Sequence, residues 1–336
     1  MKIDATLDPD THLAGVPAIA RAAQATGFDG LWTAETRHDP FLPLALAAEH
    51  TQRLELGTAV AVAFARSPTT VAHVAWDLAA SSRGRFILGL GSQVHAHVTR
   101  RFGATWSGRP VSQLRDYVAA VRAVWANWQD GTPLRLRSEH YPLSLMTPFF
   151  NPGPIDHPRI PIYLAGVGTP MARLAGEVAD GLVVHPLHSP AYLTDVLRPA
   201  IATGARAAGR DPAEIALSAS VMVATADAER ESTRSQVAFY ASTPSYRPVF
   251  EHHGWGAAAD ELSTLARRGG WEAMASVISD QMLDTFAVVA APAALGQAVA
   301  RRCAGRVDRL SLYRPFVPGV DDDGWRALIA AVRSVA

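Results

Sequence analysis

Eight short segments with the composition of β-strands, separated by longer stretches with helical periodicity, limit the fold of this 336-residue chain more than any other feature. Several segments contain only apolar residues and glycine, as in Phe86–Leu90 and Gly181–Val184. Such runs are typical of strands buried on both faces, which occur in parallel sheets. The predicted strands are Ile3–Leu7, Phe28–Ala34, Leu54–Val62, Phe86–Gly91, Ile162–Ala165, Gly181–His185, Ile215–Val223 and Arg309–Tyr313.

The stretches between these segments repeat apolar residues at the spacing of a helix. The predicted helices are His12–Thr26, Thr69–Ser82, Val111–Trp128, Met171–Ala179, Ala191–Ala208, Ala228–Tyr240, Pro292–Ala304 and Trp325–Val335. Strands that alternate with helices predict an α/β fold built from βα units, and eight such strands predict a (β/α)₈ TIM barrel. We expect one domain over residues 1–336. Segments near 92–110, 130–159 and 241–291 do not fit the repeat and are expected as insertions at the carboxyl-terminal face.

Composition excludes several classes of protein. The chain has 31 basic and 31 acidic residues, so it lacks the net positive charge of a nucleic-acid or anionic-membrane binder. Its single cysteine, Cys303, excludes an internal disulfide and a cysteine-rich metal cluster. The amino terminus lacks the pattern of a signal peptide, and the longest uncharged run, Thr285–Ala300, is too short to span a bilayer. We therefore expect a cytoplasmic protein that acts on a small molecule.

Chemistry in a barrel of this kind belongs at the carboxyl ends of the strands. After the second predicted strand, Glu35, His38 and Asp39 lie within five residues of one another. A histidine beside carboxylates can donate or relay a proton near neutral pH, which makes these three the candidate catalytic residues. The alternative is that Asp39 begins the next helix and His38 is an ordinary loop residue.

The third and fourth strands end in small residues. Ala59, Val60 and Ala61 would let a flat ligand approach the backbone closely, or would simply pack the barrel interior. After the fourth strand, Ser92 and Gln93 follow a glycine and could present N–H and hydroxyl groups to a phosphate. His95 and His97 follow, but two imidazoles without a clear acidic partner do not predict a metal site.

The fifth and sixth strands lead into a second group of candidates. Gly166, Val167, Gly168 and Thr169 form a glycine loop that enters a helix, which is a natural position for a phosphate. After the sixth strand, His185 would lie at the barrel mouth, either as a ligand contact or as a turn residue. The sequence holds no Gly-x-Ser-x-Gly, Walker or His-Glu-x-x-His motif.

Several motifs together resemble the bacterial luciferase-like flavin and deazaflavin oxidoreductases, specifically their coenzyme F420-dependent branch. The matching stretches are Glu35 with His38–Leu44, Leu56–Pro68, Gly84–Val94, Ala165–Gly168 with Ala175–Gly181, and Phe239–Tyr246. The similarity covers nearly the whole chain. The Gly-Arg-Phe-x-Leu-Gly-x-Gly and Ala-Gly-x-Gly…Ala-Asp-Gly elements are fairly specific to this family, although not to one cofactor or substrate.

The resemblance implies a barrel that binds F420, or alternatively FMN, at its carboxyl-terminal mouth. The cofactor ring would lie against a bulge at Ala59–Val60–Ala61 that often contains a non-prolyl cis peptide, and the phosphate would lie on Ser92–Gln93 and on Gly166–Thr169. We also count His185 among the cofactor-binding residues. The sequence departs from the F420-dependent sugar-phosphate dehydrogenases, which carry a glutamate where Val94 stands.

The resulting hypothesis is an F420-dependent oxidoreductase that transfers a hydride between the deazaflavin and a small organic substrate. His38 would exchange the proton, oriented by Glu35 or Asp39. The alternative is an FMNH₂-dependent monooxygenase that uses oxygen and a partner reductase. A metal-dependent hydrolase and a cofactor-binding barrel without activity are further alternatives. Family members commonly form homodimers, for which the apolar helix Thr69–Ser82 could supply a face, although burial within the chain explains its apolar residues equally well.

Overall fold

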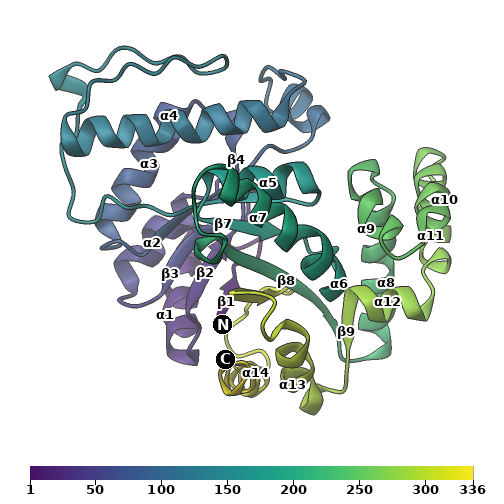
Figure 1. Cartoon of the computed structure of the whole chain (residues 1–336). Coiled ribbons are helices and arrows are strands. Elements are labelled where there is room, and N and C mark those ends of the chain that lie inside the picture. The colour runs from purple at the N-terminus through teal and green to yellow at the C-terminus, as the bar shows by residue number, and fades with distance from the viewer. Residues whose placement is uncertain (336) are drawn as a thin grey trace.

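The computed structural model describes residues 1–335 and shows a closed barrel of parallel strands surrounded by helices (Figure 1). Each of the eight predicted strands is present, so the TIM-barrel prediction is confirmed. The strands are β1 (Lys2–Thr6), β2 (Gly30–Thr33), β3 (Glu55–Thr58), β4 (Ala61–Val62), β5 (Phe86–Gly91), β6 (Ile162–Gly166), β7 (Gly181–Val184), β8 (Ala216–Ala224), β9 (Ala287–Val289) and β10 (Arg309–Leu312).

The barrel closes because β10 pairs on one side with β1 and on the other with β8. The order around the barrel is β10, β1, β2, β3, β5, β6, β7 and β8, and every pairing is parallel. β4 continues the third barrel strand and pairs with β5, while β9 extends the far end of β8. Parallel strands place all their carboxyl ends at one face of the barrel, so the loops that follow them share that face.

The helices follow the strands and cover the barrel. They are α1 (Val16–Thr26), α2 (Leu42–His50), α3 (Pro68–Ser81), α4 (Pro110–Asp130), α5 (Thr169–Val178), α6 (Pro190–Tyr192), α7 (Arg198–Ala207), α8 (Asp227–Ala241), α9 (Arg247–Glu251), α10 (Gly256–Arg267), α11 (Trp271–Val277), α12 (Asp280–Phe286), α13 (Pro292–Cys303) and α14 (Asp322–Ser334). In Figure 1, α8–α12 extend to one side of the barrel, and the segment after α4 runs back along that helix. Within residues 1–335, no helix combines the length and apolar character needed to cross a bilayer.

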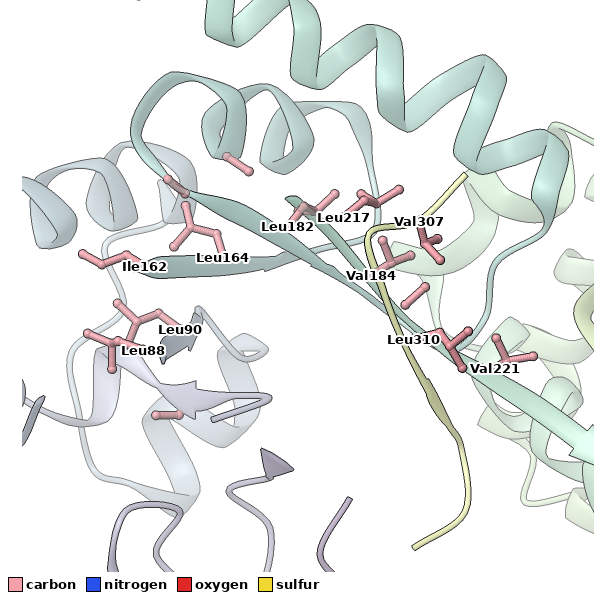
Figure 2. Packing of buried hydrophobic residues seen from close by; sticks show 14 of the residues in the cluster. Leu88, Leu90, Ile162, Leu164, Leu182, Val184, Leu217, Val221, Val307 and Leu310 are labelled. Carbon is pink, nitrogen blue, oxygen red and sulfur yellow. The ribbon is translucent and has the colours of Figure 1, made fainter. Parts of the chain in front are cut away.

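The main core lies between the outer faces of the strands and the helices. Side chains alternate along each strand, so Leu88 and Leu90 of β5 point outward beside Ile162 and Leu164 of β6 (Figure 2). All four are fully buried. The opposite residues of the same strands face the barrel interior, and they determine what the barrel can bind.

Three details differ from the sequence-based expectations. The third strand is split into β3 and β4, because Ala59 and Val60 leave the strand between them. Helix α2 was not among the predicted helices, since the stretch Leu42–Ala48 is apolar throughout and shows no helical periodicity. The short strand β9 lies in the 241–291 segment, which we expected as an insertion and not as a strand.

Helix α3, which we considered as a face for a homodimer, buries its large residues within the chain. Val71, Trp76 and Leu78 are each less than 5% exposed. The Trp76 ring stacks with that of Trp125 of α4 at a centroid distance of 6.4 Å. These side chains are therefore not available to a partner, and packing against α4 and the barrel accounts for them.

Candidate active site at the barrel mouth

The amino-terminal end of the barrel interior is filled by paired charges. Arg309 donates to both carboxylate oxygens of Asp4, at 2.8 and 2.7 Å, and also to Glu55. Glu55 accepts from Lys2 at 2.6 Å. Burial alone would lower the pKa of Arg309, but the attraction of Asp4 and Glu55 raises it above its ordinary value, so the guanidinium stays charged. Gly30 makes room for this group, because a Cβ there would lie 2.6 Å from an Asp4 oxygen.

A layer of large side chains lies above these charges. Trp32, Ile87 and Tyr163 pack together in the interior and are at most 7% exposed. The Arg309 guanidinium carbon lies 5.2 Å from the centre of the Trp32 ring. Gly57 accommodates that ring, since a Cβ there would come within 2.5 Å of it. The barrel is therefore closed from below, and a ligand can enter only from the carboxyl-terminal mouth.

Small polar residues line the mouth on the side of β8 and β10. Ser220 alternates with buried core residues along β8, and Ser311 is opposite Ser220 on β10. Their side chains therefore point inward, and both residues are only partly buried. Solvent consequently reaches the inner wall of the barrel at this height.

The predicted bulge lies on the opposite side of the mouth. The peptide bond between Ala59 and Val60 is cis, at the place that the family resemblance indicates. Both residues are partly exposed, whereas Ala61 belongs to β4 and its side chain is buried in the outer core. Gly91 of β5 lies beside the bulge, because a Cβ there would be 2.6 Å from the Cγ2 atom of Val60. Of the three predicted residues, Ala59 and Val60 thus present side chains to the mouth.

Arg66 organises the acidic cluster that follows β2. It donates to Glu35 at 2.7 Å and to Asp39 at 3.0 Å. Glu35 also accepts from the backbone N–H of Val62 at 2.6 Å, which joins the cluster to β4. Burial of Arg66 opposes its charge, but the two carboxylates outweigh that effect and raise its pKa. Glu35 and Asp39 are therefore held by Arg66, a role that the sequence did not reveal.

The structure does not show the predicted support of His38 by these acids. The second oxygen of Asp39 accepts from the backbone N–H groups of Phe41 and Leu42, at 2.8 and 3.1 Å, as at a helix start. Within residues 1–335, neither Glu35 nor Asp39 is hydrogen-bonded to His38. The imidazole of His38 is exposed in the loop after β2. Its predicted role as proton donor thus rests on its position alone.

The predicted phosphate-binding loops lie at the same face, after two neighbouring strands. Ser92 and Gln93 follow β5 and are partly exposed, and Gln93 has a left-handed backbone with φ of 59°. Its side-chain oxygen accepts from the N–H of Val94 at 2.9 Å. After β6, Gly168 is the residue that precedes α5, and Thr169 is the first residue of the helix. The first amides of a helix lack internal acceptors, so this end can receive an anion.

The glycine loop is held by the protein around it. The Tyr192 hydroxyl donates to the backbone oxygen of Val167 at 3.1 Å. A Cβ on Gly166 would lie 2.7 Å from the Cβ of Met171, so only glycine allows this turn. The loop is therefore in place before any ligand binds.

His185 lies at the mouth, after β7, and is neutral. The N–H of Leu187 donates to its Nδ1 atom at 3.1 Å, so the ring proton is on Nε2. Burial, together with repulsion from His188, lowers the pKa of His185 to about 3. The ring stacks on Tyr246 at 4.2 Å and meets the edge of Tyr240 at 4.4 Å. The contacts with Tyr240 and Tyr246 bring together residues more than fifty positions apart, which no local sequence pattern shows.

The His95 and His97 imidazoles are exposed in the segment after β5. Within residues 1–335, no three histidine, cysteine, aspartate or glutamate side chains gather in a way that could hold a metal ion. The side chain of Arg101 instead donates to the backbone oxygen of Thr36, which holds this segment over the loop that contains His38.

Comparison with known proteins assigns the fold to a family. The model of the luciferase-like monooxygenase family matches residues 1–309. The chain belongs to this family. Among its relatives, the uncharacterized protein Rv1360 of Mycobacterium tuberculosis is 48% identical over 316 residues, which is 92% of each chain.

Two reductases of the tetrahydromethanopterin type also resemble this chain. The 5,10-methylenetetrahydromethanopterin reductase of Methanolobus tindarius is 29% identical over 292 residues, covering 84% of this chain and 85% of the reductase. The solved structure of the coenzyme F420-dependent tetrahydromethanopterin reductase of Methanopyrus kandleri superposes with a TM-score of 0.79. It is 22% identical, and the match covers 99% of this chain and 98% of that one.

Proposed function

We propose that this chain is a coenzyme F420-dependent oxidoreductase that transfers a hydride between the deazaflavin and a small organic substrate. The observation that carries the proposal is the bulge at Ala59 and Val60, whose small side chains are partly exposed at the carboxyl-terminal face of the barrel. The likeness to the coenzyme F420-dependent reductase of Methanopyrus kandleri supports the choice of cofactor.

The residues present at the mouth fit such a cofactor. Gly91 has no side chain, so the Val60 side chain can lie where a Cβ on residue 91 would otherwise be. The backbone next to Val60 is then free to face the cofactor ring. Ser92, Gln93 and the amides of Gly168 and Thr169 are available for a phosphate on the adjoining side of the mouth. Both groups lie on loops that follow barrel strands, and the barrel fixes their separation.

When bound, F420 supplies the hydride donor or acceptor, and the protein supplies orientation, exclusion of water and proton exchange. The closed layer around Trp32 prevents solvent from entering through the base of the barrel. In this proposal, His38 exchanges a proton with solvent or substrate at the rim. Arg66 fixes the loop that carries it, through the pairs with Glu35 and Asp39.

A titration of the purified, cofactor-free protein with F420 and, separately, with FMN tests the proposal. We expect F420 to bind with a micromolar or lower Kd and FMN to bind at least tenfold more weakly. The opposite preference would assign the chain to an FMNH₂-dependent monooxygenase that requires a reductase. Binding of neither cofactor would overturn both assignments.

A control variant distinguishes specific binding from general affinity for aromatic molecules. Replacing Gly168 by Asp places a negative charge at the start of α5, where the phosphate is proposed to bind. A Cβ there meets only an ordinary contact of 3.6 Å with Pro170, so the fold should tolerate the change. We expect the F420 affinity of Gly168→Asp to fall at least tenfold, and an unchanged affinity would show that the phosphate binds elsewhere.

A further inference from the structure

Four aromatic side chains form a continuous wall on one side of the barrel mouth. His185 follows β7, Tyr240 lies on α8, Tyr246 follows α8, and Tyr313 follows β10. His185 contacts Tyr240 and Tyr246 at the distances given above, and the Tyr240 and Tyr313 rings are 6.1 Å apart. The hydroxyls of Tyr240 and Tyr313 are hydrogen-bonded to each other. We call these four residues the aromatic wall.

The aromatic wall faces the bulge across the mouth. Around the closed barrel, β7 and β10 are each three strands away from β3, and β8, which leads into α8, is directly opposite. The wall is therefore built from the three strands farthest from Ala59 and Val60. A molecule that lies against the bulge has its other side toward this wall.

The aromatic wall carries no net charge. His185 is neutral, as shown above, and burial raises the pKa values of Tyr240 and Tyr246, so both hydroxyls keep their protons. The neighbouring charge, Arg314, is paired with Asp321 at 3.4 Å, and its guanidinium carbon lies 5.1 Å from the centre of the Trp325 ring. The cation is thus already engaged by protein groups.

The hydroxyl pair keeps one donor free. When Tyr240 and Tyr313 are bonded to each other, one hydroxyl donates and the other accepts, so one O–H remains for a third group. Tyr313 is 42% exposed, whereas Tyr240 is half-buried, so Tyr313 is the member that a ligand can reach. Below the pair, the inward-facing hydroxyls of Ser220 and Ser311 add further uncharged donors and acceptors.

We infer that the aromatic wall binds an uncharged oxygen of the substrate, either a carbonyl or a hydroxyl, through the Tyr313 hydroxyl. Tyr240 is the positioning residue that fixes the Tyr313 hydroxyl, and the stacked rings select a flat or apolar body behind the oxygen. Because the four wall residues supply no cation and the neighbouring Arg314 is already paired with Asp321, phosphate and carboxylate groups are disfavoured. The inference rests on the proposed function, since it assigns the substrate side of the same mouth.

Calorimetric titration with three ligands of matched size tests this inference. Acetophenone carries an uncharged carbonyl, benzoate carries a carboxylate, and ethylbenzene carries no oxygen. Each is titrated into the cofactor-free protein and into the protein saturated with oxidised F420, which cannot reduce the ketone. We expect acetophenone to bind about five- to tenfold more tightly than ethylbenzene, and benzoate to bind more weakly than acetophenone.

Single-residue variants test whether the tighter binding of acetophenone depends on the Tyr313 hydroxyl. In Tyr313→Phe, we expect the acetophenone affinity to fall to that of ethylbenzene, while the affinities for ethylbenzene and F420 stay the same. Tyr240→Phe should reduce the ratio of acetophenone to ethylbenzene affinity two- to threefold, a readout that general structural damage would not move. The control is Tyr141→Phe. The Tyr141 hydroxyl accepts from Gln113 on α4 and lies outside the wall, so this variant should change none of these affinities.

The outcomes separate the inference from the proposed function. Equal binding of acetophenone and ethylbenzene, tighter binding of benzoate, or an unchanged ratio in Tyr313→Phe would each overturn the inference. A failure to bind F420 would overturn the proposed function alone, because the titration of the cofactor-free protein still reports on the wall.

Discussion

At the amino-terminal end of the barrel, the buried side chains of Arg309 and Asp4 pair with each other, and Arg309 also pairs with the partly exposed Glu55. At the carboxyl-terminal end, Ser220 and Ser311 are uncharged and partly exposed, and within the described residues they are not paired in this way. Both groups face the interior of the same barrel. At the amino-terminal end the polar side chains pair with one another, and at the carboxyl-terminal end they remain available to a ligand. The comparison shows that the residues expected to stabilise the fold lie at the amino-terminal end of the barrel, whereas the residues available for binding lie at the carboxyl-terminal end, as in other barrels of this type.

The largest expected effect tests the closed end. Arg309→Met removes the cation and leaves the carboxylate of Asp4 buried without a partner, which should reduce the free energy of unfolding by about 3–5 kcal/mol. Denaturant unfolding measures the loss. Lys2→Met is the control, because Lys2 pairs with the same Glu55 from an exposed position and should cost less than about 1 kcal/mol. If both variants lost the same small amount, the buried pair would not stabilise this end.

The next effect tests the open end. Gly91→Ala places a Cβ 2.6 Å from the Cγ2 atom of Val60, so the bulge must move. We expect a cost of about 1–3 kcal/mol in unfolding free energy and a roughly tenfold rise in the Kd for F420, measured by titration. Gly256→Ala on α10 meets only a 3.5 Å contact and serves as the control. An unchanged Kd in Gly91→Ala would separate the bulge from the cofactor site.

The smallest effect concerns pH. The pKa of His185 is about 3 in the folded protein against an ordinary value of 6.5, so between these values the unfolded state binds the additional proton. Stability is therefore complete above about pH 6.5 and falls as the pH falls toward 3. At pH 5.5, the titration of His185 should reduce the free energy of unfolding by about 1.4 kcal/mol. This reduction should be absent in His185→Leu.

Unfolding curves at pH 8 and pH 5.5 for both proteins measure this difference. At pH 8 they give the direct cost of the substitution, and the change between the two pH values isolates the titration. His188, whose pKa burial lowers to about 4, remains in both proteins and contributes equally to each. Identical pH dependence in the two proteins would mean that His185 is charged in the folded state.

The sequence predicted the barrel well because strand burial leaves a local signal. Runs such as Phe86–Leu90 are apolar on both faces, and their spacing determines the order of the units. Helix α2 was missed because a helix that is apolar on nearly all sides, like Leu42–Ala48, shows no period. The split of the third strand was not predicted as such, although the family resemblance indicated a bulge at Ala59–Val60.

The candidate site was less predictable because it depends on distant contacts. Arg66 holds Glu35 and Asp39 from about thirty positions away, so a sequence window around His38 contains the two acids but not the arginine that binds them. The hydrogen bond between Tyr240 and Tyr313 joins residues 73 positions apart. Local spacing predicted candidate loops at the carboxyl-terminal face, but the partners of each side chain emerged only from the closed barrel.

The division of the mouth also affects how such a protein can change during evolution. Tyr240 and Tyr246 belong to the chain between β8 and β9, whereas Ala59 and Val60 lie between β3 and β4. Mutations and length changes between β8 and β9 alter the wall opposite the bulge while the bulge and its neighbour Gly91 stay in place. A duplicated gene can therefore change the proposed substrate side of the mouth through this segment and keep the proposed cofactor site intact.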